Sequence, residues 1–298
     1  METPGNQHQD FTQLKHALII RIKQAEIFSS TMPDQLAATT TAAELLEILK
    51  PNMSWCLVDK LFTAEDLENW FGTVTLQKAH IYTSGRINID LKESCTITLL
   101  ANVYVTIHVT DSAVADIEAF ETSWAIILVA DKASANTRAW DKSHLTVKAS
   151  ALSCTSVETR DESSANVGTE ERGFAKIVAW DSSSITLHTN DSSYAFAFAW
   201  NNATLKVTAK DFSAIAIDPR NNSSAIVETI DSASATVFAS DSATATVKAS
   251  GSSTATISED ADSNIAYSLG DGDCPTIKDL KRKKLIIAPA GFSIEEIR

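Results

Sequence analysis

Six large side chains that recur every twenty residues are the feature of this sequence best suited to binding a partner. Aromatic rings and guanidinium groups stack on flat surfaces such as sugar rings, exposed bases or apolar patches of another protein. Their spacing predicts one outward stripe, which is the predicted partner-binding site. In the other interpretation, the rings stack on one another and cover the edge of a thin core. The six residues are Phe120, Trp140, Arg160, Trp180, Trp200 and Arg220.

More aromatic residues lie in the same part of the chain. Tyr194, Phe196 and Phe198 alternate with alanines, and we expect them on the sheet opposite to the stripe. Residues 174 to 200 are therefore predicted to be the most adhesive segment of the protein.

Acidic residues supply the best case for catalysis. Glycan-cleaving β-helices carry clusters of carboxylic acids on one outer face, and four acids here share one alternate series, although Arg138, Val178 and Phe198 interrupt them. The histidines His108, His144 and His188 are scattered, and no HExxH, nucleophile elbow or phosphate-binding loop is present. We predict no catalytic residue and no cofactor, with a glycan-processing enzyme as an alternative. The four acids are Asp116, Glu118, Glu158 and Asp218.

Aspartates recur at residue numbers that end in 1. Nine of the fifteen such residues from Asp111 to Gly251 are Asp, and two more are Asn. A column of carboxylates could attract a divalent cation, but the glycine-rich nonapeptide of calcium-binding β-rolls is absent. Asp and Asn bond to their own backbone and tolerate tight corners. We therefore predict turn-forming residues and no metal site.

These residues belong to a ten-residue repeat that extends without insertion from about Ile81 to Gly270. Sixteen of the nineteen residues whose numbers end in 7, from Ile87 to Tyr267, are Ile, Val or Leu. Small apolar residues alternate with variable ones, which is typical of a strand with one buried face. A strand and a corner repeated many times predict a parallel β-solenoid, in which each coil pairs with the coils above and below.

The inward residues indicate two strands, and so twenty residues, in each coil. Larger residues at numbers ending in 5 fall mostly in one alternate series, as expected if one sheet is lined with larger side chains than the other. About nine coils at about 4.8 Å each predict a rod roughly 45 Å long. The larger residues of that series are Val105, Leu145, Ile185, Leu205 and Ile265.

The two ends differ from the repeat and resemble covers for the exposed strands. We predict an α-helical cap or interaction domain at 1–80, the solenoid at 81–270 and a C-terminal cap at 271–298. Helical patterns occupy 11–28, 41–50, 54–62 and 64–71, with a linker from Met32 to Thr40 and capping boxes at Thr41 and Thr63. The C-terminal segment suggests two short strands, with the basic run 281–284 protecting an edge.

The repeat is similar to a known type. The segment "AWDSSSITLHTNDSSYAFAFAWNNATLKVTAKD" at 179–211 resembles the alanine- and serine-rich decapeptide repeats of uncharacterised bacterial and phage proteins, and the resemblance covers about 190 of 298 residues. It implies a β-helical body and a bacterial or viral origin, hence a phage or prophage structural or host-interaction role. It transfers no catalytic residue.

Charge and composition limit the partners. With a net charge of −13 and a pI near 4.9, a broadly basic face for nucleic acid is not expected. An acidic rod that mimics DNA and inhibits a DNA-binding enzyme is an alternative. Four widely spaced cysteines (Cys56, Cys95, Cys154 and Cys274) suggest reduced thiols. We expect no signal peptide, a cytoplasmic protein or a virion component if phage-encoded, and a protein or glycan partner, with homo-oligomers through the N-terminal helices as a further option.

Overall fold

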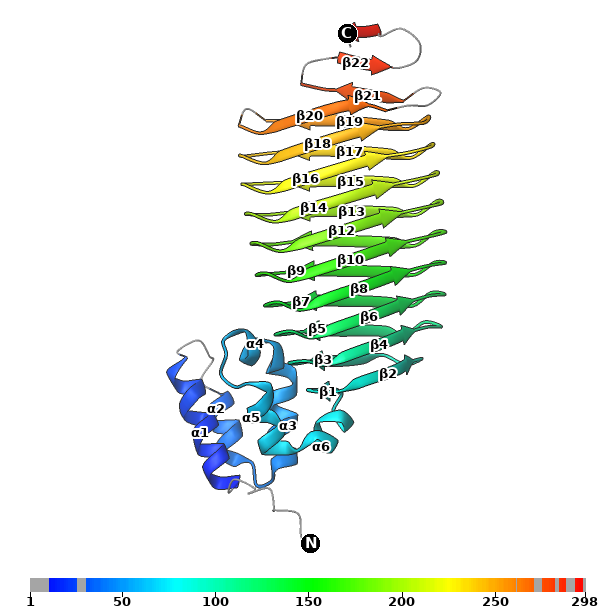
Figure 1. Ribbon diagram of the computed structural model, residues 1–298. Coiled ribbons are helices and arrows are strands. Elements are labelled where there is room, and N and C mark those ends of the chain that lie inside the picture. The colour runs from blue at the N-terminus through cyan, green and yellow to red at the C-terminus, as the bar shows by residue number, and fades with distance from the viewer. Residues whose placement is uncertain are drawn as a thin grey trace.

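Each ten-residue repeat folds as a six-residue strand followed by a four-residue corner. The computed structural model describes residues 11–25, 31–260, 262–270, 275–281, 284–287 and 293–296. From β4 (Tyr104–Val109) to β20 (Asn264–Leu269), every strand begins at a number ending in 4 and ends at a number ending in 9. The strands stack into a long rod with helices beside its N-terminal end (Figure 1).

Successive strands alternate between two parallel sheets. From β3 to β20 each strand pairs with the strand twenty residues away, so that Phe174 lies opposite Tyr194 in one sheet and Ser164 opposite Ser184 in the other. The register is shorter at the first coil, where Arg86 lies opposite Tyr104. The prediction of a two-sheet parallel β-solenoid with twenty residues per coil is therefore confirmed. The larger inward residues Leu145, Ile185 and Leu205 all belong to one sheet, which we call sheet B.

Among the described residues, sheet A has thirteen strands and sheet B has ten. The strands of sheet A are β1 (Ile81–Tyr82), β3 (Cys95–Leu99), β5 (Val114–Ala119), β7 (Ser134–Ala139), β9 (Cys154–Thr159), β11 (Phe174–Ala179), β13 (Tyr194–Ala199), β15 (Ala214–Pro219), β17 (Ser234–Ala239), β19 (Thr254–Glu259), β21 (Thr276–Asp279), β22 (Lys284–Ile287) and β23 (Ser293–Glu296). Those of sheet B are β2 (Arg86–Leu91), β4, β6 (Trp124–Val129), β8 (His144–Ala149), β10 (Ser164–Thr169), β12 (Ser184–Thr189), β14 (Thr204–Ala209), β16 (Ser224–Thr229), β18 (Thr244–Ala249) and β20.

The corner residues at numbers ending in 1 adopt the left-handed conformation, with φ between 54° and 61° for the non-glycine residues from Ala101 to Asp241. Asp and Asn tolerate this region better than other residues with a Cβ atom, so the prediction of turn-formers is confirmed. The carboxylates of several of these aspartates, however, accept hydrogen bonds from the neighbouring coil. Asp131 accepts the backbone N–H of Asp111 at 3.2 Å, and Asp191 accepts that of Glu171 at 3.1 Å.

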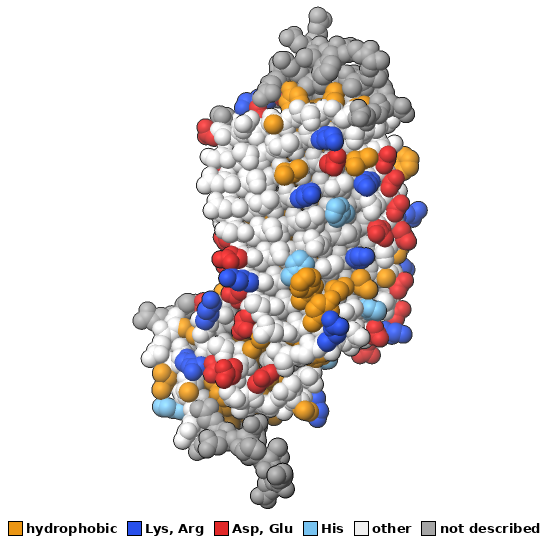
Figure 2. All heavy atoms as spheres, in the orientation of Figure 1, with side chains coloured by type: hydrophobic (Ala, Val, Ile, Leu, Met, Phe, Trp, Pro, Cys, Tyr) orange, Lys and Arg blue, Asp and Glu red, His pale blue; other side chains and the backbone are white. Residues whose placement is uncertain are grey.

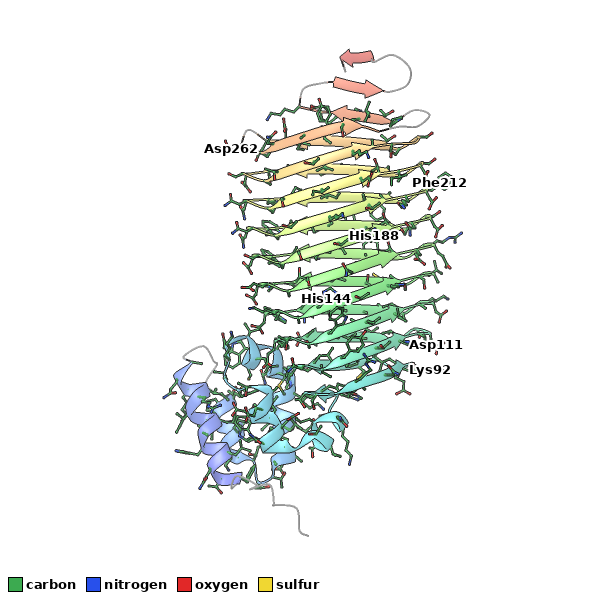
Figure 3. The ribbon with its side chains drawn as sticks, viewed as in Figure 1. Lys92, Asp111, His144, His188, Phe212 and Asp262 are labelled. Carbon is green, nitrogen blue, oxygen red and sulfur yellow. The ribbon has the colours of Figure 1, made fainter. Side chains whose placement is uncertain are left out.

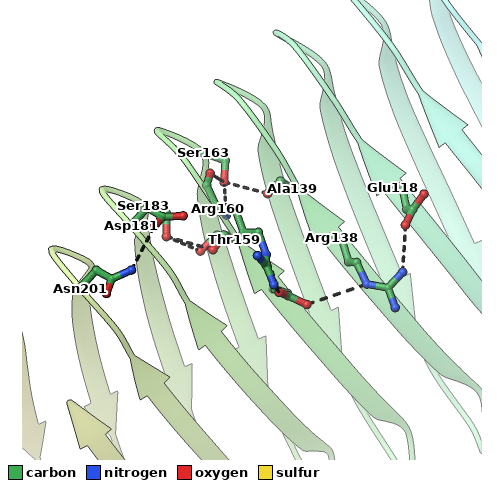
Figure 4. Close-up of polar contacts among 10 residues, drawn as sticks. Glu118, Arg138, Ala139, Thr159, Arg160, Ser163, Asp181, Ser183 and Asn201 are labelled. Carbon is green, nitrogen blue, oxygen red and sulfur yellow. Dashed lines mark hydrogen bonds and ion pairs between the residues drawn. The ribbon is translucent and has the colours of Figure 1, made fainter. Parts of the chain in front are cut away.

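The core between the sheets combines alanines with Ile, Val and Leu residues, and serines lie at its edges. Serines next to the corners are buried, and the hydroxyls of most of them donate to backbone carbonyls of the preceding coil, whereas those of Ser123 and Ser153 find no partner among the described residues. Ser163 donates to Ala139 at 3.0 Å, and Ser183 donates to Thr159 at 3.1 Å (Figure 4). Buried hydroxyl groups need such partners, so these bonds let a polar side chain occupy the edge of the core and also link successive coils.

The N-terminal region is helical, and both predicted capping boxes are present at Thr41–Glu44 and Thr63–Asp66. The predicted linker from Met32 to Thr40 is wrong, because Pro33 lies in the first turn of a short helix whose residues Met32 and Leu36 are buried. The helices are α1 (Phe11–Gln24), α2 (Met32–Ala38), α3 (Ala42–Leu49), α4 (Met53–Val58), α5 (Ala64–Phe71) and α6 (Thr73–Lys78), with a 3-10 turn, η1, at Lys50–Asn52.

The helices pack against the side of the first coils as well as near their end. Their hydrophobic core includes Ile81, Leu100 and Phe120 from the solenoid. Figure 1 shows this arrangement, with α1 to α5 beside the corner that leads from sheet A to sheet B. No helix among the described residues has the length and apolar character needed to span a bilayer.

The C-terminal end has three described strands where the sequence suggested two. β21 continues sheet A in parallel with β19, and β22 and β23 then add in antiparallel orientation. Cys274, Arg282 and Lys283 lie outside the described residues, so the predicted role of the basic run stays a prediction.

Candidate binding site

The six residues of the predicted stripe stack into one continuous corner column. Each directly follows a strand of sheet A, so neighbours along the column are one coil apart. Phe120 and Trp140 stack at 6.0 Å with an interplanar angle of 3°, and Trp180 and Trp200 stack at 5.2 Å with 13°. The Arg160 guanidinium lies 5.1 Å from the Trp140 ring and 5.2 Å from Trp180, and that of Arg220 lies 4.8 Å from Trp200.

This stacking limits what the corner column offers to a partner. The flat faces of the rings lie against the next member, so mainly ring edges remain for solvent. Phe120 is only 1% exposed because the helices cover it, and the expectation of an outward, accessible side chain is wrong at this position. The indole N–H groups of Trp140 and Trp180 are buried and find no acceptor among the described residues. Partner binding by the column stays a prediction.

The four acids considered for catalysis lie on the outer face of sheet A, and each is held by a polar partner. Glu118 accepts from Ser54 of α4 and pairs with Arg138 at 2.9 Å. Arg138 also lies 3.8 Å from Glu158, which pairs with Arg160 at 2.7 Å (Figure 4).

The other two acids are bound in the same way. Asp218 pairs with Arg220 at 2.7 Å, and Asp116 accepts from Asn136 at 2.8 Å. Glu158 and Asp218 thus orient the two arginines of the corner column. This arrangement gives Glu158 and Asp218 a supporting role in the corner column.

A mixed-charge cavity of about 400 Å³ lies where the helices meet sheet A. Asp116, Glu118 and Arg138 line its solenoid side, and Lys50 and Ser54 line its helical side. Its charged groups are already paired with one another or with near neighbours: Lys50, for example, lies 3.3 Å from Glu47. The cavity is therefore best explained as part of the polar contact between the helical region and the solenoid.

The histidines do not form a site together. His144 and His188 project from sheet B at different heights along the rod (Figure 3), and His108 lies near Asp90 at 3.2 Å. No group of three or more His, Cys, Asp or Glu side chains suited to a metal ion occurs in the described part of the chain. The prediction of isolated histidines agrees with these positions.

A second aromatic surface, which we call the aromatic band, crosses the outer face of sheet A. Because β11 and β13 pair in register, Phe174 lies beside Tyr194 and Val178 beside Phe198. Phe196 contacts both Phe174 and Tyr194 edge-on, at 6.0 and 5.0 Å. The aromatic band consists of Phe174, Val178, Tyr194, Phe196 and Phe198.

The aromatic band is partly exposed, with Phe174, Val178 and Phe198 half-buried, and it is continuous with the corner column. Tyr194 is 39% and Phe196 36% exposed, and Phe212 at the opposite corner is 75% exposed. The expectation that Tyr194, Phe196 and Phe198 lie on the sheet opposite to the stripe is wrong. Trp200 directly follows β13, so the band and the column are parts of one surface. The twenty-residue register, applied to Phe174 and Tyr194, would have revealed this from the sequence.

The fold and these surfaces define a class of protein, a two-sheet parallel β-solenoid with a helical N-terminal region and outward aromatic surfaces. Comparisons of the chain with protein-family models, with curated proteins and with solved structures gave no match. The resemblance to decapeptide-repeat proteins of bacteria and phages therefore stays a prediction.

Proposed function

We propose that this protein is a non-enzymatic binding rod, in which the solenoid is a rigid scaffold that holds a protein partner against the aromatic band. The observation that supports this proposal is the grouping of five large apolar side chains on two neighbouring strands of an exposed, flat sheet. Contiguous exposed apolar patches on proteins are commonly interaction sites. The exposed edges of Trp180 and Trp200 extend this surface toward the corner column.

The chemistry of the aromatic band favours a protein over a glycan. A bound sugar needs hydrogen-bonding groups around its ring, since unpaired hydroxyls lose their bonds to water. The outward side chains of β11 and β13 supply one hydroxyl, from Tyr194, and one ammonium group, from Lys176. An apolar segment of another protein does not need more hydrogen-bonding groups than these two.

The size of the aromatic band indicates what kind of contact it makes. A six-residue strand spans roughly 20 Å and two neighbouring strands are together roughly 10 Å wide, so the band covers on the order of 200 Å². A stable interface buries about 800 Å² on each partner. The band is therefore the anchor of a larger contact or the seat of a short apolar segment, and it is too small to hold two copies of the chain together by itself.

The rival functions have less support. A DNA mimic requires continuous rows of negative charge, whereas Lys132, Arg172 and Lys210 adjoin the corner acids along one edge of the rod. A glycan-processing enzyme requires carboxyl groups available to the substrate, whereas the four acids considered for catalysis are each held by a polar partner. Association through the N-terminal helices stays a prediction.

The decisive experiment compares two folded variants with the wild type in capture of partners from lysate of the source cells. The band variant carries Tyr194→Ser and Phe196→Ser. The control carries Phe238→Ser, which removes another exposed ring of sheet A, 47% exposed, outside the band. We expect a partner to be retained by the wild type and the control and lost by the band variant. Equal capture by all three, with unchanged circular dichroism, would contradict the proposal.

A further inference from the structure

A second row of rings lies on the outer face of sheet B, at the first position of consecutive strands. Arg86, Tyr104, Trp124 and His144 are aligned there by the pairing of β2, β4, β6 and β8. The Arg86 guanidinium lies 4.8 Å from the Tyr104 ring, and Trp124 lies 6.0 Å from Tyr104 and 4.4 Å from His144. We call these four residues the sheet B ladder. The helices lie away from this face (Figure 1).

The rings of the sheet B ladder are tilted, unlike those of the corner column. Trp124 makes interplanar angles of 31° with Tyr104 and 55° with His144. Its side chain is 45% exposed, and Ile126 and Leu128 project from the same strand beside it. Figure 2 shows this face, with a hydrophobic group close to a histidine. Part of the Trp124 ring face is therefore open to a flat ligand.

The sheet B face also differs in charge from the rest of the molecule. Among the outward residues of the ten sheet B strands described, four are basic and two are acidic, although the whole chain has a net charge of −13. Within the described residues, no carboxylate lies within ion-pairing distance of Arg86, Lys148 or Lys206. The four basic residues are Arg86, Lys148, Lys206 and Lys248. A ligand with negative charges complements this face.

Hydrogen-bonding groups surround the rings, in contrast to the aromatic band. The His144 Nδ1 atom lies 2.8 Å from the Ser164 hydroxyl, and the Asn166 amide lies 3.4 Å from His144 Nε2. Burial lowers the pKa of His144, which favours the neutral ring, and the hydroxyl of Ser164 and the amide of Asn166 remain as polar groups beside it. Thr106 and Thr146 project from neighbouring positions. Rings with polar neighbours are the usual composition of a sugar-binding surface.

The spacing of the coils fits a chain of sugars along the rod. The rise of about 4.8 Å per coil is close to the length of one pyranose unit, so successive sugars would meet equivalent positions. Arg86, Lys148 and Lys206 are each three coils apart, or roughly 14 Å. Such sparse cations match carboxylates carried by some of the sugars, whereas a nucleic acid presents a phosphate at every nucleotide and would also approach the acidic corners on both sides.

We propose that the outer face of sheet B binds a carboxylate-bearing polysaccharide that lies along the rod. Trp124 stacks on a sugar ring, and Arg86 and Lys148 pair with carboxylates. This surface is on the opposite sheet from the aromatic band, so the proposal does not depend on the protein partner there, and either can fail without the other.

The test measures retardation of the full chain in native gels that contain hyaluronate or polygalacturonate, with dextran as the uncharged probe. We expect retardation by at least one acidic polysaccharide, weaker at high salt, and none by dextran. Trp124→Ala should weaken binding about tenfold or more, as for other exposed aromatic anchors, and Lys148→Ala should weaken it as well. The matched controls Phe238→Ala and Lys278→Ala, both on sheet A, should bind as the wild type does.

Each contrary result would overturn the proposal. If the wild type binds neither acidic polysaccharide, acidic polysaccharides are not its ligands. If dextran retards it equally, charge does not contribute to binding. If a variant with both Trp124→Ala and Lys148→Ala keeps its circular dichroism and still binds fully, the polysaccharide does not bind at the sheet B ladder. Binding of poly(dT) without binding of the polysaccharides would identify a nucleic-acid surface instead.

Discussion

Replacement of Arg160 tests whether the corner column is mainly structural. Its guanidinium lies between the rings of Trp140 and Trp180, at 5.1 and 5.2 Å, and pairs with Glu158 at 2.7 Å. Each partly exposed cation–π contact contributes about 0.5 to 1 kcal/mol. The ion pair is also partly exposed and adds at most about 1 kcal/mol. Arg160→Ala should therefore lower the free energy of unfolding by about 1 to 3 kcal/mol.

A lysine variant separates charge from shape at the same position. Arg160→Lys keeps the positive charge but lacks the planar group that fits between two rings, so it should recover only part of the loss. Glu158 retains Arg138 at 3.8 Å in both variants, which avoids an isolated carboxylate. Arg172→Ala, at the opposite and exposed corner, is the control and should change stability little.

The assay is urea unfolding followed by circular dichroism and by tryptophan fluorescence. A lower midpoint with an unchanged slope would indicate a loss of stability without a change in the unfolded state. We also expect the emission of Trp140 and Trp180 to shift to longer wavelength as their faces become hydrated. If Arg160→Ala unfolds at the wild-type midpoint and the emission is unchanged, the guanidinium does not hold the coils together. The column would then be free to serve a partner.

Two further predictions concern the corners. Asp191→Ala should lower the free energy of unfolding by about 1 to 2 kcal/mol, because alanine disfavours the left-handed conformation and lacks the carboxylate that accepts from Glu171. Asp191→Asn should lower it less. Equal thermal midpoints for both variants would contradict this explanation. Bonds from the backbone N–H groups of Asp241 and Ser263 hold the pKa of Asp260 below its ordinary value of 3.8. A lowered pKa in the folded state stabilises the protein above 3.8, and that stability is lost as pH falls through the folded-state pKa. Asp260→Asn should therefore be less stable than the wild type at pH 6, and the two should converge in acid; a constant difference in unfolding midpoint between pH 6 and pH 2.5 would refute the assignment.

Much of the architecture could be predicted from the sequence, because the repeat is local and regular. The alternation at Val105 or Ile177 fixes which side chains face inward, and the left-handed corner at Asp111 follows from the residue types that tolerate it. The linker prediction failed at Met32 because the segment is short and polar, and only packing of Met32 and Leu36 against other helices stabilises a helix there.

The sequence alone determined the strand, the corner and the twenty-residue coil, since each depends on neighbours within one or two repeats. Only the tertiary structure decided how accessible the outward side chains are. It covered Phe120 with helices, and it paired Glu158 and Asp218 with arginines. It also left Trp124 tilted and exposed on the other sheet. Ring orientation, coverage and ion pairing depend on atoms from separate coils and helices, and a pattern read along a single chain does not contain them.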